Sequence, residues 1–268
     1  MNKPAAAKSM TEETVPHTRM MKCTLEVEPT RAYWAECGLI GGPVSKDHAF
    51  QRAIFGSKTY LRVEGLIADM RHRYDAFPPA LDVLGHWHDM RPDDRVLICH
   101  WHTQLADPVY RRFTGELLVD RYAHGPRPTV HREMVITWLE NQVPGRWQFP
   151  TRCKIASKMM TSAFTAGLLT SSRDPRTIRH PRVSDQALTY LAYLLRDVRF
   201  AGTLIANPYV ASVGLDRDRV CRRLRAIPAV GFRRQGELID FQWQYDHLQQ
   251  WAEAAGLCDA VGSGRGAG

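Results

Sequence analysis

Apolar residues in the central part of the chain recur mostly three or four positions apart, which places their side chains on one face of an α-helix. The clearest runs are Leu61, Val63, Leu66, Ile67 and Met70, and later Val135, Trp138 and Leu139. This pattern predicts a mainly α fold, in which a helical N-terminal body is followed by winged-helix-like units with short β-hairpins.

Helix starts are marked at several positions. Ser184 precedes a leucine-rich run, and its hydroxyl can accept hydrogen bonds from the free amides of the first helical turn. Asp107 stands before Pro108, and proline is favoured at the first position of a helix. Asp93 and Asp94 are expected to begin another helix, because carboxylates stabilise a helix N-terminus.

Two prolines, Pro126 and Pro128, separate a helix expected around 111–123 from one expected at about 129–142. The main domain boundary is therefore predicted here. Residues 23–127 would form a helical domain, and 128–256 a winged helix-turn-helix-like region. The ends, 1–22 and 257–268, lack apolar periodicity and are expected to be disordered tails.

The first predicted unit combines the helix at 129–142, a turn at Pro144-Gly145 and a longer helix at 151–169. Ile155, Met159 and Ala163 fall on its buried side. The polar and basic residues of this helix and of the loop after it are the candidate backbone contacts, because hydroxyl and cationic groups both donate to phosphate oxygens. They are Arg152, Lys154, Lys158 and Thr161, followed by Arg173, Arg176 and Arg179.

The second predicted unit begins with a short helix at 207–213, which Gly214 ends, and Asp216 can cap the next helix. On that helix Val220 and Leu224 are predicted to be buried. The following stretch has strand character, with Gly236 at the turn of a hairpin. The candidate contacts with nucleic acid are Arg219, Arg222 and Arg223 on the helix, and Arg233 and Arg234 on the hairpin.

Charge is concentrated in this part of the chain. The whole sequence carries a formal charge of +8, whereas residues 146–236 hold 17 Lys or Arg and 5 Asp or Glu, a net of +12, which leaves −4 for the rest. A local positive field indicates a polyanionic partner such as nucleic acid. No stretch approaches the roughly 18 apolar residues of a membrane span, and residues 1–22 lack the apolar core of a signal peptide. A cytoplasmic protein with no membrane partner is expected.

Two other kinds of chemistry, a zinc site and a nuclease site, are suggested by residues of the N-terminal half. His86, His88, His100 and His102 could supply four zinc ligands if they alternated on two strands. The absence of a CxxC pair among the six scattered cysteines favours packed, hydrogen-bonded histidines, so no metal or cofactor is expected. Asp93 and Asp94 lack further residues that would complete a nuclease site, so no catalytic activity is expected.

Read as a whole, the chain resembles the BrxA family of the BREX phage-defence systems over about residues 30–255. The resemblance is carried by residues 34–42, the helix at 61–74, the segment from Cys99 to Arg111, and the run from Lys154 to Leu169. It implies a mostly helical protein with winged-helix character that binds duplex DNA without catalysis. It also implies partners within the defence system, namely a methyltransferase, an ATPase and a phosphatase-like protein.

The resulting hypothesis is a non-enzymatic accessory protein that binds double-stranded DNA through basic helices and wings. Arginine-rich helix faces are also common on solvated surfaces, where exposed ion pairs contribute little. The alternatives are a protein-protein scaffold or adaptor within the defence complex, and a transcriptional regulator that binds one operator as a dimer.

Overall fold

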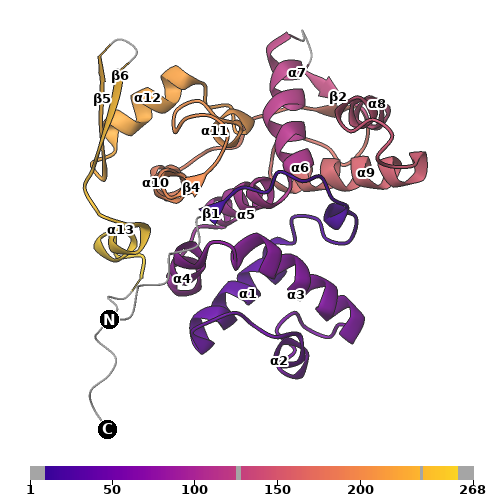
Figure 1. Ribbon diagram of the computed structural model, residues 1–268, viewed down its shortest axis with the longest axis horizontal. Coiled ribbons are helices and arrows are strands. Elements are labelled where there is room, and N and C mark those ends of the chain that lie inside the picture. The colour runs from indigo at the N-terminus through magenta and orange to yellow at the C-terminus, as the bar shows by residue number, and fades with distance from the viewer. Residues whose placement is uncertain (1–9, 125–127, 236–237, 259–268) are drawn as a thin grey trace, which may run out of the picture.

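The fold was analysed in a computed structural model, which describes residues 10–124, 128–235 and 238–258. Helices dominate it, as predicted, and strands occur only as short pairs in the described part of the chain (Figure 1). One continuous core of buried side chains runs through the body and through both units that follow it.

The body consists of five helices. They are α1 (Val27–Ile40), α2 (Lys46–Gln51), α3 (Tyr60–Tyr74), α4 (Pro78–His86) and α5 (Pro92–Ala106). The predicted stripe on α3 is buried from Val63 to Met70, whereas Leu61 at its start is 77% exposed. Helices α1 and α4 approach closely where Gly38 meets Gly85. Glycine is needed at both positions, since a Cβ there would lie 3.0 Å or less from the opposite backbone.

Helix α5 is the centre of the molecule, and every residue from Leu97 to Ala106 is buried. A helix buried on all sides must satisfy its polar side chains within the protein. Trp101 Nε1 donates to the Tyr209 carbonyl oxygen at 3.1 Å, which ties α5 to the C-terminal unit. Asp93 and Asp94 lie in the first turn of α5, as predicted.

Residues 10–22 are ordered in the structure, so the predicted tail at 1–22 is wrong for this part; residues 1–9 lie outside the described residues. Strand β1 (Met10–Thr11) pairs in parallel with β4 (Val198–Arg199), and η1 (Arg19–Met21) forms one 3-10 turn. The buried Glu12 carboxylate accepts hydrogen bonds from the Tyr209 hydroxyl and the Ala201 amide, and lies 3.4 Å from Arg111 Nε. These contacts between distant segments cannot be read from local periodicity.

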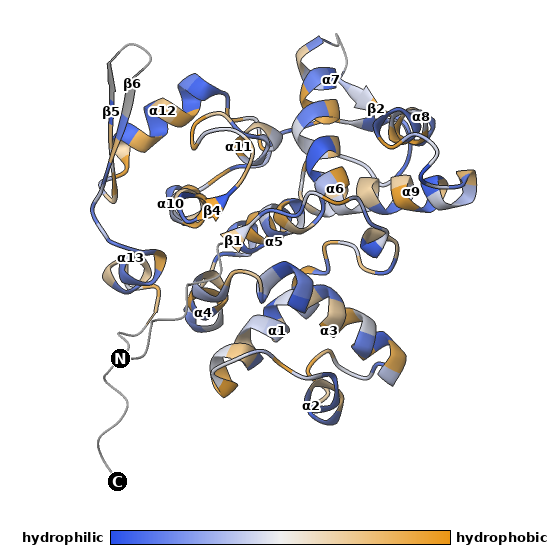
Figure 2. Cartoon of the chain, in the orientation of Figure 1, coloured by the Kyte–Doolittle hydropathy of each residue, from blue (hydrophilic) through white to orange (hydrophobic). Residues whose placement is uncertain are grey.

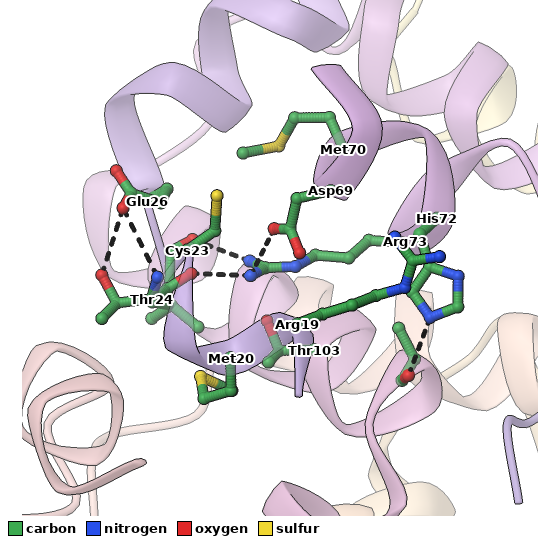
Figure 3. A network of polar contacts seen from close by, with 12 residues as sticks. Arg19, Met20, Cys23, Thr24, Glu26, Asp69, Met70, His72, Arg73 and Thr103 are labelled. Atoms are coloured by element: carbon green, nitrogen blue, oxygen red, sulfur yellow. Dashed lines mark hydrogen bonds and ion pairs between the residues drawn. The ribbon is translucent and has the colours of Figure 1, made fainter. Parts of the chain in front are cut away.

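Residues 10–25, which precede α1, are called the arm. The end of the arm is fixed by a buried arginine of α3 (Figure 3). Arg73 is only 2% exposed and donates to the carbonyl oxygens of Thr24 and Leu25 at 2.6 and 3.1 Å. Its charge is balanced by Asp69, whose carboxylate lies 2.6 Å away. The arm therefore belongs to the packed body and is not a separate tail.

The first winged-helix-like unit follows. Its elements are α6 (Pro108–Arg112), the π-helical turn η2 (Phe113–Leu117), α7 (Leu118–His124), β2 (Thr129–Val130), α8 (Arg132–Gln142), α9 (Phe149–Thr165) and β3 (Arg176–Thr177). Strand β2 pairs antiparallel with β3, and Leu169 bridges to Ile178 on the other side. This is the helix and strand order of a winged helix, with 171–175 as the wing.

Two predicted helix boundaries are wrong here. Residues Thr129 and Val130 form a strand, since these β-branched residues pair with β3. Helix α9 ends at Thr165 and not at Leu169, because Gly167 takes a left-handed conformation with φ of 76°. The helix before the expected 127/128 boundary also packs on α8, where the rings of Phe113 and Trp138 lie 6.2 Å apart.

The second unit runs to the end of the described chain. Its elements are α10 (Asp185–Arg196), β4, α11 (Pro208–Ser212), α12 (Arg217–Ala226), β5 (Val230–Gln235), β6 (Leu238–Trp243) and α13 (Leu248–Ala254). The predicted caps are confirmed, since side-chain oxygens of Asp107, Ser184 and Asp216 accept from amides of the helices that follow. Strands β5 and β6 pair antiparallel, while the expected turn residue Gly236 lies outside the described residues. The predicted tail at 257–268 is wrong at Leu257, which is buried, and 259–268 lie outside the described residues.

Candidate nucleic-acid interface

Helix α9 presents two lysines on its outer face. Ile155, Met159 and Ala163 are buried against the unit, as predicted, and Lys154 and Lys158 are exposed one turn apart. Thr161 is exposed too, but its hydroxyl donates to the Ser157 carbonyl oxygen at 2.8 Å. That hydroxyl is therefore engaged with the helix backbone, and the lysines carry the positive charge of this face.

A third cation joins the lysines. Arg132, in the first turn of α8, is exposed and lines with them a shallow hollow of about 260 Å³ whose other lining residues are Met21, Cys153 and Ser157. No carboxylate lines this hollow among the described residues. Sequence reasoning did not single out Arg132, because only the packing of α8 on α9 brings it to the face of the second helix.

Arg152 is also on α9 but is directed inward. Its guanidinium makes an ion pair with Glu140 of α8 and donates to the Trp147 carbonyl oxygen at 2.7 Å. These bonds hold the two helices together. Arg152 is therefore placed as a structural residue and not beside Lys154 on the exposed face.

The wing contains both exposed and buried arginines. Arg173 and Arg179 are exposed, and Arg179 Nε donates to the Gly167 carbonyl oxygen at 2.9 Å. Arg176 is 8% exposed and pairs with Asp174 at 3.0 Å. Asp174 also accepts from the Arg132 amide at 2.8 Å, so it fixes the wing on α8. The even spacing of these arginines in the sequence did not reveal that Arg176 turns inward.

Helix α12 has the predicted amphipathic arrangement, and Figure 2 shows it as a largely hydrophilic helix with hydrophobic residues between. Val220 and Leu224 are buried, and Arg219 and Arg222 are exposed. Arg219 contacts the Gly214 carbonyl oxygen at 3.1 Å and Asp216 at 3.3 Å. Arg222 has no ion pair with another described residue, and its charge is uncompensated in the described part of the chain.

Arg223 differs from its neighbour. It donates to the Val183 carbonyl oxygen at 2.8 Å and makes an ion pair with Asp185, so it joins α12 to the start of α10. The guanidinium is partly buried by these contacts. Of the three arginines expected on one face of α12, two are therefore presented to solvent and the third holds the unit together.

The hairpin adds one exposed arginine, Arg233, which lies opposite Asp240 in the strand register. The side chain of Arg234 lies outside the described residues. Arg225 of α12, which sequence reasoning did not select, is exposed and stands over the Phe232 ring at 5.7 Å. This cation-π contact links the helix to the hairpin and adds a further cation to this side of the unit.

The four histidines do not come together on two strands. His100 and His102 lie on α5, whereas His86 ends α4 and is exposed and His88 follows it. The His100 ring is hydrogen-bonded to the hydroxyls of Tyr110 and Ser212. The His102 ring is hydrogen-bonded to the Tyr190 hydroxyl and the Arg73 carbonyl oxygen. Burial lowers the pKa of both to about 3, so both are neutral packing residues at neutral pH.

The part of the chain that the structure describes offers little other chemistry. No group of three or more histidine, cysteine or acidic side chains there could hold a metal ion. All six cysteines are free thiols, and no described helix has the length and apolar character needed to cross a membrane.

The fold and the exposed cations define a mainly α protein with two winged-helix-like units joined to a helical body. Among solved structures, the chain is similar to one described as the crystal structure of an uncharacterized protein from Magnetospirillum magneticum. The two share 20% identity with a TM-score of 0.53, over 68% of this chain and 97% of the other. No family model and no curated protein matches the chain. The similarity shows a shared fold.

Proposed function

We propose that this protein binds double-stranded DNA without catalysing a reaction, as an accessory component of a BREX phage-defence system. The observation that carries the DNA proposal is the group of Arg132, Lys154 and Lys158 around one hollow on α9 that no described carboxylate lines. In a winged helix, the corresponding second helix of the helix-turn-helix enters the major groove. Two cations on that helix and a third from the adjoining α8 match the phosphates that border a groove.

The second unit supports the same proposal. Arg219, Arg222 and Arg225 of α12 are exposed, with Arg233 on the adjoining hairpin. Non-specific binding to duplex DNA comes mainly from release of counterions when such cations approach phosphates. Contacts with phosphates carry no direct sequence information, so the expected activity is binding with little sequence preference.

The direct test is fluorescence anisotropy of a labelled duplex of random sequence, titrated with the protein at several salt concentrations. If about six phosphates are contacted, affinity falls by about a thousandfold or more between 50 and 200 mM salt. A duplex from the cognate genome should bind equally well. No binding at the lowest salt concentration would overturn the proposal.

The place in a BREX system rests on the resemblance over about residues 30–255. Its expected consequence is association with the methyltransferase, the ATPase or the phosphatase-like protein of the same system. Co-expression of tagged protein with these components, followed by purification in nuclease-treated buffer, tests that association apart from shared DNA. Failure to retain any of the three would remove this part of the proposal and leave DNA binding to be judged separately.

A second candidate, a scaffold that docks a partner protein on the body, is favoured by a groove between the arm and α3. The groove has a volume of about 870 Å³ and is lined by Arg19, Lys22 and the exposed Leu61. Its Glu64 and Asp69 already pair with Lys46 and Arg73. If this candidate is correct, L61D should abolish retention of a partner while DNA binding is unchanged.

A further inference from the structure

The two winged-helix-like units are joined by a short linker, 178–184, that is packed on both of them. On the side of the first unit, the ring of His180 lies 4.1 Å from the ring of Tyr122 of α7. On the side of the second unit, His180 contacts Gly214, where an added Cβ would lie 2.2 Å from the imidazole ring. Gly214 forms the turn between α11 and α12, so one histidine connects the first unit with the helix-turn-helix of the second.

Other contacts hold the linker along its length. Arg179 Nε donates to the Gly167 carbonyl oxygen at the end of α9, and Val183 receives a hydrogen bond from Arg223 of α12. The side chain of Arg179 is therefore bonded just beyond the end of α9, and the backbone of Val183 is bonded to α12. Together with the contacts of His180, these bonds tie the linker to both units.

The same linker carries positive charge. Arg179 and Arg182 are exposed and line a hollow of about 360 Å³ beside α9. Arg219 of α12 donates to the carbonyl oxygen of Gly214, the residue that His180 contacts. Burial and the nearby Arg219 charge lower the pKa of His180, so the imidazole adds no charge at neutral pH. Asp93 of α5 also lines the hollow and opposes the arginines.

We infer that Arg179, Arg182 and Arg219 form a phosphate-binding bridge between the two units, so that one DNA duplex is bound by both units at the same time. This inference rests on the proposed function. A rigid connection between two binding modules raises affinity by about 10² to 10⁴ when the ligand can reach both modules, without any new contact. The bridge supplies phosphate contacts at the point where the duplex passes from α9 to α12.

The test compares a short and a long random duplex by anisotropy. A winged helix covers about one helical turn, so about 12 base pairs reach one unit and about 24 reach both. The wild-type protein should bind the long duplex at least about 100-fold more tightly. If the wild-type protein binds the long duplex only about twofold more tightly than the short one, as expected from the larger number of sites alone, the inference is overturned. Absence of binding to either duplex would instead overturn the proposed function.

Variants of the linker separate its charge from its packing. R179A/R182A should lower the salt slope on the long duplex by about 1.8, which is about 0.9 for each lost phosphate contact, and R179K/R182K should restore it. H180A should reduce the long-to-short ratio while short-duplex affinity stays unchanged. D93N should strengthen binding of the long duplex. The control R31A/R71A removes two exposed arginines of the body and should leave the salt slope and the long-to-short affinity ratio unchanged. If this control lowers the salt slope as much as R179A/R182A does, the bridge is contradicted.

Discussion

The lysines of α9 offer a quantitative test of the DNA-binding proposal. Lys154 and Lys158 are exposed beside the buried stripe that contains Ile155 and Met159. Their removal should therefore leave the helix and its packing intact, because alanine has the higher helix propensity and no buried contact is lost. The double variant K154A/K158A changes the charge of this face alone.

The expected effect follows from counterion release. Each phosphate contact contributes about 0.9 to the slope of log affinity against log salt concentration, so six contacts give a slope of about 5.4. Between 50 and 200 mM salt, the wild-type affinity then falls by about 2,000-fold. With four contacts remaining the slope is about 3.6, and the affinity of the variant falls by about 150-fold over the same range.

The assay is anisotropy of a labelled random duplex at five or more salt concentrations, with unfolding curves recorded for each variant. K154R/K158R should keep the wild-type slope, since the charge is preserved. K46A/K58A, which removes two lysines of the body, is the matched control. Equal slopes for K154A/K158A and the wild type would refute the assignment of α9 as a DNA-contacting helix.

Three further predictions concern stability. E12A should lower the free energy of unfolding by about 3 kcal/mol in urea denaturation, because it leaves the buried Tyr209 and Arg111 without their carboxylate partner. A loss below about 1 kcal/mol would contradict the buried role of Glu12. G115V should destabilise the fold by about 1 to 3 kcal/mol, since its Cβ would meet Pro208 of α11 at 2.5 Å, whereas G65A faces open space and serves as control. For His102, the folded pKa of about 3 lies below the unfolded value of 6.5, so the unfolded chain binds the extra proton and stability falls as pH falls through this window. Between pH 8 and pH 5 this residue should cost about 2 kcal/mol, and the loss of stability over that range should be smaller by this amount in H102Q.

Local signals in the sequence were sufficient for most helices. Caps such as Ser184 and Asp216, and the apolar stripe of α9, depend on neighbouring residues only, and the structure has them as expected. The helix-turn-helix and hairpin order of the second unit also follows from such signals, whereas β2 of the first unit was predicted as part of a helix. The ordered arm was missed because β1 pairs with β4, nearly 190 residues away, and nothing near Met10 indicates that partner.

The candidate site could be predicted only in part, for a related reason. Lys154 and Lys158 lie outside a clear apolar stripe, so their exposure could be inferred from helical geometry. Arg176 and Arg223 have similar neighbours in the sequence but turn toward Asp174 and Asp185, and only the positions of these carboxylates in the fold decide this. The charge of an arginine can be read from the sequence, whereas the group that balances it depends on tertiary packing.

The same packing connects the body to the DNA-binding proposal. Helix α5 bonds to the second unit through Trp101 and His100, and Glu12 of the arm bonds to α11 through Tyr209. These contacts are buried, and none of them is made by an exposed cation. A change such as E12A should therefore weaken binding to a long duplex more than to a short one, because it loosens the second unit without removing a charge that faces DNA. An equal loss on both duplexes would indicate that the arm acts on overall folding alone.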